Sequence, residues 1–323
     1  MVCQNSFNPL KNRNRKTFFA TYDVYYKECV VYNYFIRKSD TKNEKAEDVM
    51  NQSLKPKMKT ILFAALLIVL MLAIQVIAGV FAGVAVSLGT VLTGNNLGYE
   101  SLIPLSVLLS QMACLIIFGI WYYAKYVKKD KNEGVYESGL KKISNFKDLA
   151  FIIALSVAGF FFANIVSQIE VAVMPEAGKE FESMMESVLG NGSIIGVISA
   201  ALIAPISEEI VFRGLLVKNA KKVFGLTGCM LLSGIAFGIV HLNPIQSIYA
   251  IPLGMLLAYL AYMYNSIIPA ILLHMINNSL SVFFPMIYHG EFSYIICILL
   301  CVVFIAFAVV IKKFLFKKEL VVS

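Results

Sequence analysis

The sequence predicts an all-α polytopic membrane protein with about eight transmembrane helices. Of the 323 residues, 59% are hydrophobic and only 15% are charged, a balance that soluble globular domains do not have. Apolar runs recur from residue 60 to residue 311, and each has about the ~20 residues that an α-helix needs to cross a bilayer. The charged residues gather between these runs, as in loops at a membrane surface.

A helical membrane domain is therefore expected over residues 60–311. We expect its spans at residues 60–90, 102–125, 148–173, 193–217, 226–242, 247–265, 267–288 and 293–311. The fifth is the shortest. The first begins like a secretory signal peptide but stays apolar to about Val91, far beyond the ~7–15 residues of a signal core, so we interpret it as a retained span.

Basic residues mark every second loop. They precede the first span, separate the second from the third, and follow the fourth and the eighth, whereas the other loops hold almost none beyond Lys179. Because cytosolic loops are enriched in lysine and arginine, this parity predicts that both termini are cytosolic, and we place the chain in a bacterial cell membrane. The same bias explains the net charge of +8, so no nucleic-acid partner is expected.

Two polar tails flank the predicted membrane domain. Residues 1–59 are basic, rich in tyrosine and asparagine, and without apolar periodicity, so we expect a poorly ordered cytosolic tail. A translation start at Met50 or Met58 is an equal alternative, which leaves open whether residues 1–49 are translated. Residues 312–323 are expected to form a basic cytosolic tail.

The most informative stretch lies in the fourth predicted span and reads A-P-I-S-E-E-I-V-F-R, ending at Arg213. A charge at the bilayer centre costs at least ~2.5–3.5 kcal/mol, so ionisable residues there are functional candidates by default. Glu209 and Arg213 are four residues apart and can pair on one helix face. Glu208 lies ~100° round the helix and needs a partner from another helix. The candidate partners are His241, His274 and Asn278.

Pro205 precedes the two acids. Because proline lacks an N–H, it frees the carbonyl of Ala201 and can bend the helix so that polar groups meet a cavity. The alternative for the whole cluster is a structural ion-pair network that fixes helix packing.

Two further motifs carry polar groups on apolar segments. His241 closes the run F-G-I-V-H, with Phe237 one turn earlier, while His274 and Asn278 project from one helix face in H-M-I-N-N. Each has a simpler interpretation as a helix-end or interhelical hydrogen-bonding group. His289 is given no role. Three glycines are interpreted as close-packing positions: Gly234, Gly238 and Gly254.

Together these groups suffice for hydrolysis of a peptide bond without a covalent intermediate. A carboxylate with an imidazole can hold and deprotonate water, and a second imidazole with an amide can donate hydrogen bonds to the developing oxyanion. The chain has neither G-x-S-x-G nor H-E-x-x-H, which argues against serine hydrolases and zincins. Its six cysteines show no C-x-x-C spacing and indicate neither a disulfide framework nor a zinc knuckle.

These motifs resemble those of the CAAX-protease and bacteriocin-processing (CPBP) family of intramembrane endopeptidases, also called Abi or type II CAAX prenyl endopeptidase-like proteins. E-E-x-x-x-R at 208–213, F-x-x-x-H at 237–241 and H-x-x-x-N at 274–278 occur in the family's order. The resemblance covers a catalytic core of about residues 190–290. It implies an active site within the bilayer and a membrane-associated peptide or protein substrate, cleaved by CAAX-type or leader-type processing.

The resemblance also implies roles for single residues. Glu208 and His241 would activate water, His274 and Asn278 would form the oxyanion site, and Glu209, Arg213 and Phe237 would support them. The family has also been called metalloproteases, and two histidines with a carboxylate can bind Zn²⁺. Metal dependence therefore stays open, with the candidate ligands Glu208, His241 and His274.

Helix geometry conflicts with this grouping if all spans are straight. At 1.5 Å per residue, Glu208 and His274 lie ~14 Å and ~13 Å from the cytosolic ends of their helices, but His241 lies ~24 Å from its own. We therefore expect the fifth helix to be tilted or to enter the membrane as a re-entrant segment.

Two other functions are kept as alternatives. The first is a non-catalytic membrane immunity or scaffold protein of the same fold. The second, less favoured, is a proton-coupled transporter in which buried acids and histidines relay protons. No internal repeats are evident in the sequence, and this argues against the transporter.

Overall fold

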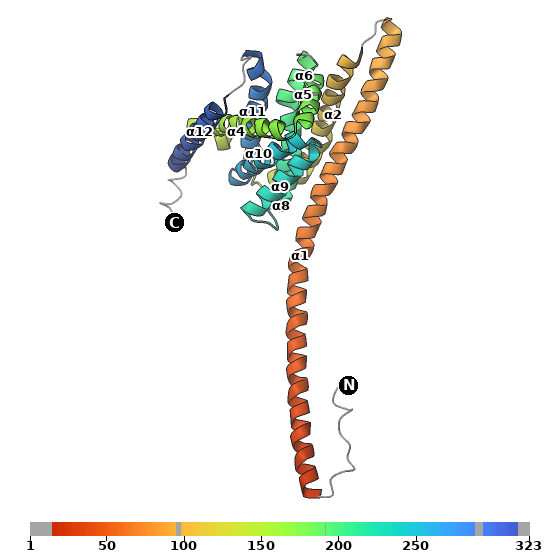
Figure 1. Cartoon of the computed structure of the whole chain (residues 1–323), viewed down its shortest axis with the longest axis vertical. Coiled ribbons are helices and arrows are strands. Elements are labelled where there is room, and N and C mark those ends of the chain that lie inside the picture. Colours follow the sequence, from red (N-terminus) through yellow and green to blue (C-terminus); the bar gives the residue numbers. More distant parts are fainter. Residues whose placement is uncertain (1–14, 95–97, 191, 288–292, 316–323) are drawn as a thin grey trace. The chain divides into compact units, whose positions relative to one another are not determined.

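Figure 1 shows the fold as a computed structural model that describes residues 15–94, 98–190, 192–287 and 293–315. These residues are helical or lie in short connections, and none of them is in a strand. His289 and the ends of both predicted tails lie outside the described residues. Contacts divide the chain into two units, residues 1–58 and residues 59–323.

In the first unit, residues 15–58 are helical and form the first part of helix α1 (Arg15–Thr93). Helices in solution are stabilised mainly by packing of an apolar face, and this segment has no apolar periodicity. The proposed disorder and cytosolic location of residues 1–59 are not tested by this helical conformation and stay predictions.

The second unit is an all-α membrane domain, as the composition predicts. Among the described residues, seven helices are long and apolar enough to cross a bilayer, and a shorter apolar helix, Leu226–Val240, is the eighth. The chain is thus a multi-pass integral membrane protein. Besides α1 and the fourth span, which is described below, the long helices are α2 (Gly98–Tyr122), α4 (Phe146–Val173), α10 (Pro244–Met263), α11 (Ile268–Ile287) and α12 (Tyr294–Leu315). Each overlaps a predicted span.

The acidic segment between the third and fourth spans, expected as a loop, forms helix α5 (Pro175–Leu189). Pro175 occupies the first turn, where a proline loses no helical hydrogen bond. Glu176 complements the helix dipole in the same turn, and Gly190 ends the helix with φ 54°. Local signals for both helix ends were therefore present in the sequence.

The fourth span is a continuous helix in which α and π hydrogen bonding alternate. It runs through α6 (Ile194–Ile198), η4 (Ser199–Ile203), α7 (Ala204–Glu209), η5 (Ile210–Val217) and α8 (Lys218–Ala220). The segments η4 and η5 are π-helical, and such insertions are frequent at functional sites. The two acids of α7 thus lie between two π segments.

Glycines bring α9 (Leu226–Val240) and α10 into backbone contact. A Cβ built on Gly254 would lie 3.0 Å from the Cα of Gly234, and one built on Gly234 would lie 2.7 Å from the carbonyl oxygen of Ile251. A Cβ on Gly238 would lie 3.0 Å from the carbonyl oxygen of Ser247. The predicted role of these glycines in close packing is confirmed.

This contact gives a stability prediction. Gly234→Ala is expected to lower the free energy of unfolding by about 1–3 kcal/mol, because the new methyl group meets backbone that cannot rotate away. The measurement is thermal unfolding of the detergent-solubilised protein. Gly119→Ala in α2 is the control: its Cβ meets nothing within 4 Å, so the better helix propensity of alanine should leave stability equal or higher. Equal melting temperatures for both variants would contradict the packing role.

Candidate active site

The centre of the site is the carboxylate of Glu209, whose side chain is fully buried together with that of Arg213. Arg213 Nη1 donates to Glu209 Oε1 at 2.7 Å, so the predicted pair forms. Arg213 Nη2 donates to the carbonyl oxygen of Gly254 at 2.8 Å. The guanidinium therefore joins the helix of the acids to α10, where Gly254 lies in the close contact with α9.

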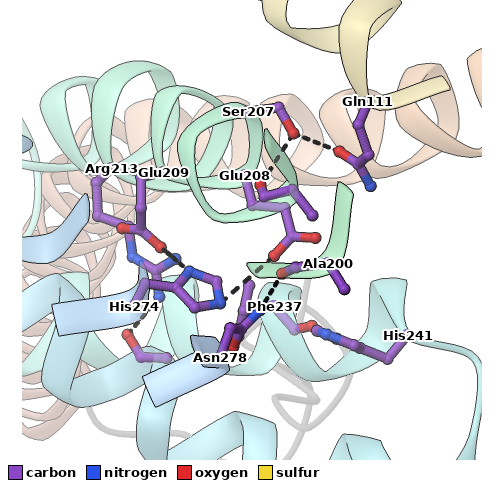
Figure 2. A network of polar contacts seen from close by, with 12 residues as sticks. Gln111, Ala200, Ser207, Glu208, Glu209, Arg213, Phe237, His241, His274 and Asn278 are labelled. Atoms are coloured by element: carbon purple, nitrogen blue, oxygen red, sulfur yellow. Dashed lines mark hydrogen bonds and ion pairs between the residues drawn. The ribbon is translucent and has the colours of Figure 1, made fainter. Parts of the chain in front are cut away.

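His274 on α11 lies between the two acids (Figure 2). Its Nδ1 is 2.9 Å from Glu209 Oε1, and its Nε2 is 3.8 Å from Glu208 Oε2. Among the three candidate partners of Glu208, His274 is therefore the one in ion-pair range. Glu208 keeps 14% of its side chain exposed, whereas Glu209 has none exposed, so the adjacent acids lie in different environments.

Asn278 lies one turn after His274 and donates from Nδ2 to the carbonyl oxygen of Ala200 at 3.0 Å. The helix itself explains why this carbonyl is free. In η4 the N–H of Ala204 bonds the carbonyl of Ser199, five residues earlier. In that register the next donor would be residue 205 and its acceptor Ala200, but Pro205 has no N–H. The carbonyl that Pro205 leaves free is thus that of Ala200, one residue before Ala201, which regular α-helical hydrogen bonding predicted.

Phe237 lies between the two histidines. Its ring centre is 4.8 Å from that of His241 and 5.5 Å from that of His274, both in edge-on geometry. Its carbonyl oxygen is 2.6 Å from His241 Nδ1. Since a carbonyl can only accept, Nδ1 carries the hydrogen and Nε2 of a neutral His241 is left as an acceptor.

The position of His241 follows from the short α9 and the turn after it. With 15 residues, α9 is ~22 Å long, less than the ~30 Å of a bilayer core, so it can end beside the other site groups. The turn is tight: Leu242 has φ 55°, and Asn243 caps α10 by accepting from Gln246 N. Among the described residues no direct hydrogen bond or ion pair joins His241 to Glu208. The water-activating pair implied by the family resemblance is thus not in direct contact.

The sequence reasoning missed Gln111. It lies on α2, is 7% exposed, and is hydrogen-bonded to the hydroxyl of Ser207, the residue before Glu208. Ser207 Oγ is also 3.0 Å from the carbonyl oxygen of Ala204. The available signal was a glutamine inside an apolar span, since polar residues in membrane helices commonly join neighbouring helices.

The proposed zinc ligands do not form a metal site as placed. Among the described residues there is no group of three His, Cys, Asp or Glu side chains that could hold a metal ion. Nδ1 of His241 faces a carbonyl and Nδ1 of His274 faces Glu209, and His274 Nε2 is 3.8 Å from Glu208. Metal dependence therefore stays a prediction.

Residues 190–280 match the family model described as type II CAAX prenyl endopeptidase Rce1-like. All three motifs lie within the matched segment, so the resemblance to the CPBP family is confirmed. The match supports a CAAX-type intramembrane protease fold. Neither the comparison with curated proteins nor the comparison with solved structures gave a match.

The buried ion pair gives the second prediction. Arg213→Ala is expected to destabilise the protein by about 3–5 kcal/mol, because it leaves the Glu209 carboxylate buried with one donor fewer. Thermal unfolding in detergent measures the loss. The control is Lys179→Ala, which removes an exposed pair with Glu176 and should have no measurable effect. A small change in Arg213→Ala would show that Glu209 does not need its charged partner.

Proposed function

We propose that the chain is an intramembrane endopeptidase that hydrolyses a peptide bond in a membrane-associated protein or peptide. The observation that carries the proposal is the pairing of a partly exposed carboxylate, Glu208, with a buried imidazole, His274, inside the segment that matches the family. The proposed reaction is CAAX-type or leader-type processing of that substrate.

Glu208 is the base of the proposed reaction. Its side chain is 14% exposed, against 4% for His274 and none for Glu209 and Arg213, so it is the charged group that water reaches. The carboxylate accepts a proton from water while the water oxygen attacks the carbonyl carbon of the substrate. Nε2 of His241, left as an acceptor by the Phe237 carbonyl, is proposed as the second group that orients the water.

His274 is proposed as the first donor of the oxyanion site. Its Nδ1 is 2.9 Å from Glu209 Oε1, which holds the ring, and its Nε2 lies on the side of Glu208, at 3.8 Å from Oε2. An N–H at Nε2 would stabilise the oxyanion formed by water attack.

Asn278 supplies the second donor in this proposal. A side-chain amide has two N–H groups, and one of them is held by the carbonyl of Ala200. The amide plane is thereby oriented, and the other N–H is available to the oxyanion. As the tetrahedral intermediate collapses, the C–N bond breaks and protonated Glu208 returns its proton to the leaving amine.

The test of the proposed function compares wild type with Glu208→Gln. The amide keeps the shape of the side chain but cannot accept the proton, so cleavage should fall about 10²–10⁴-fold. The measurement is mass spectrometry of membrane and secreted peptides from cells with matched expression. Glu182→Gln, an exposed acid on α5, is the control and should cleave normally. The same assay with a zinc chelator decides metal dependence.

Three outcomes separate the functions. A product formed by wild type and by Glu182→Gln, but not by Glu208→Gln, supports the protease. No product from any folded form supports the non-catalytic scaffold. A protease whose cleavage survives Glu208→Gln would contradict the role of Glu208 as the base.

The freed carbonyl of Ala200 gives a separate prediction. Pro205→Ala restores an N–H that competes for this carbonyl, so Asn278 should lose its fixed orientation. We expect kcat to fall by up to the ~10²–10³-fold cost of losing one oxyanion donor, with little change in KM. The measurement is a double-mutant cycle with Asn278→Ala. If Pro205 acts through Asn278, the double variant should be no slower than Asn278→Ala alone. Losses of activity that add up in the double variant would contradict this.

A further inference from the structure

Three lysines surround one aromatic ring where α2 and the fourth span end. The ammonium groups of Lys125, Lys218 and Lys222 lie 5.5, 5.3 and 5.8 Å from the ring centre of Tyr126. Lys125 follows α2, whereas Lys218 lies in α8, at the end of the helix that carries the two acids of the candidate site, and Lys222 follows that helix. The cluster is thus assembled from two helices that are far apart in sequence. We refer to these three residues as the lysine cluster.

The lysine cluster holds more positive charge than its surroundings neutralise. Lys218 is paired with Asp130, Nζ to Oδ2 at 3.4 Å. Among the described residues, no carboxylate pairs with Lys125 or Lys222. Like charges this close repel one another, and repulsion is stronger near a membrane than in bulk water. Contacts with the Tyr126 ring are favourable but weak, so an anion is the natural counter-charge.

The local backbone presents two of these side chains. Lys125 and Tyr126 lie in a π-helical turn, η2 (Tyr123–Val127), in which the N–H of Lys128 bonds the carbonyl of Tyr123. A π turn inserts an extra residue and changes the direction of the side chains in it. The Tyr126 residue itself is buried, 8% exposed, so its ring is a fixed platform for the cluster.

The surroundings of the cluster are those of a membrane interface. Lys125 lies 4.8 Å from the ring of Phe63 on α1 and 5.7 Å from that of Trp121. The residue just before each of these aromatic residues is apolar and exposed, 61% for Leu62 and 66% for Ile120. The cluster therefore adjoins apolar surface of the kind that faces acyl chains, and aromatic residues are typical of this depth.

We propose that the lysine cluster binds the phosphate of an anionic lipid head group. Basic pockets between membrane helices at the cytosolic face bind such head groups. A lipid fits better than free phosphate because apolar surface for acyl chains adjoins the positive charge. The bound phosphate would join the end of α2 to the end of the helix that carries Glu208. This inference does not depend on the proposed enzymatic function.

The chain carries its own probe for the test, because Trp121 is its only tryptophan and it borders the cluster. The full chain is reconstituted in phosphatidylcholine vesicles with a minor fraction of phosphatidylglycerol, and bromine on the acyl chains of one lipid quenches tryptophan fluorescence. Brominated phosphatidylglycerol should quench the tryptophan fluorescence about tenfold more than its mole fraction in the vesicle would give. This excess should fall as salt screens the lysines.

The variant Lys125→Gln/Lys218→Gln/Lys222→Gln should reduce quenching to the share of phosphatidylglycerol in the vesicle. The matched control, Lys128→Gln/Lys129→Gln/Lys131→Gln, removes the same number of charges from the segment directly after η2, outside the cluster, and should keep the excess. The single variant Lys222→Gln, at an exposed position, gives an intermediate loss that does not depend on folding of the triple variant. Proportional quenching in wild type, or equal loss in cluster and control variants, would overturn the proposal. Loss of the excess on adding inorganic phosphate alone would assign the site to free phosphate instead.

Discussion

The structure of the candidate active site depends on one buried carboxylate, that of Glu209. Its Oε1 faces two nitrogen groups from different helices, Arg213 Nη1 at 2.7 Å and His274 Nδ1 at 2.9 Å. Burial of an ionised carboxylate is unfavourable without such partners, so the helices that bring them must pack in this arrangement. Arg213 reaches the carbonyl of Gly254 only where α9 and α10 touch through glycine. Electrostatics and close packing thus impose the same geometry.

Hydrogen-bond register supplies the second constraint. A regular α-helix over the fourth span would pair each carbonyl with the N–H four residues later and leave none for a neighbouring side chain except before proline. The π turn before Pro205 instead leaves the carbonyl of Ala200 free, and the Asn278 side chain donates a hydrogen bond to it. The irregular backbone of this helix is therefore tied to the position of the amide, and so to the proposed oxyanion site.

Much of this could be predicted from the sequence because it depends on local pattern. Apolar runs gave the eight spans, and four-residue spacing gave the Glu209–Arg213 pair. The sequence could not decide which of the candidate partners contacts Glu208, because the choice of His274 over His241 depends on how α9 and α11 pack. The shift from Ala201 to Ala200 required the π register, which no residue pattern reports. Gln111 was missed because a single amide in an apolar span is a weak signal.

The two neighbouring acids illustrate how one helix can separate anchoring from chemistry. Successive residues point ~100° apart, so a helix packed on one side buries one acid and leaves its neighbour partly exposed. Glu209, fully buried, is bound by Arg213 and faces His274, and it cannot be released without unpairing a buried charge. Glu208 keeps 14% of its side chain exposed and has His274 Nε2 at 3.8 Å, too far for a direct hydrogen bond. Glu209 thus holds the His274 ring in place while Glu208 makes no direct hydrogen bond to it, the arrangement that the proposed general-base role of Glu208 needs.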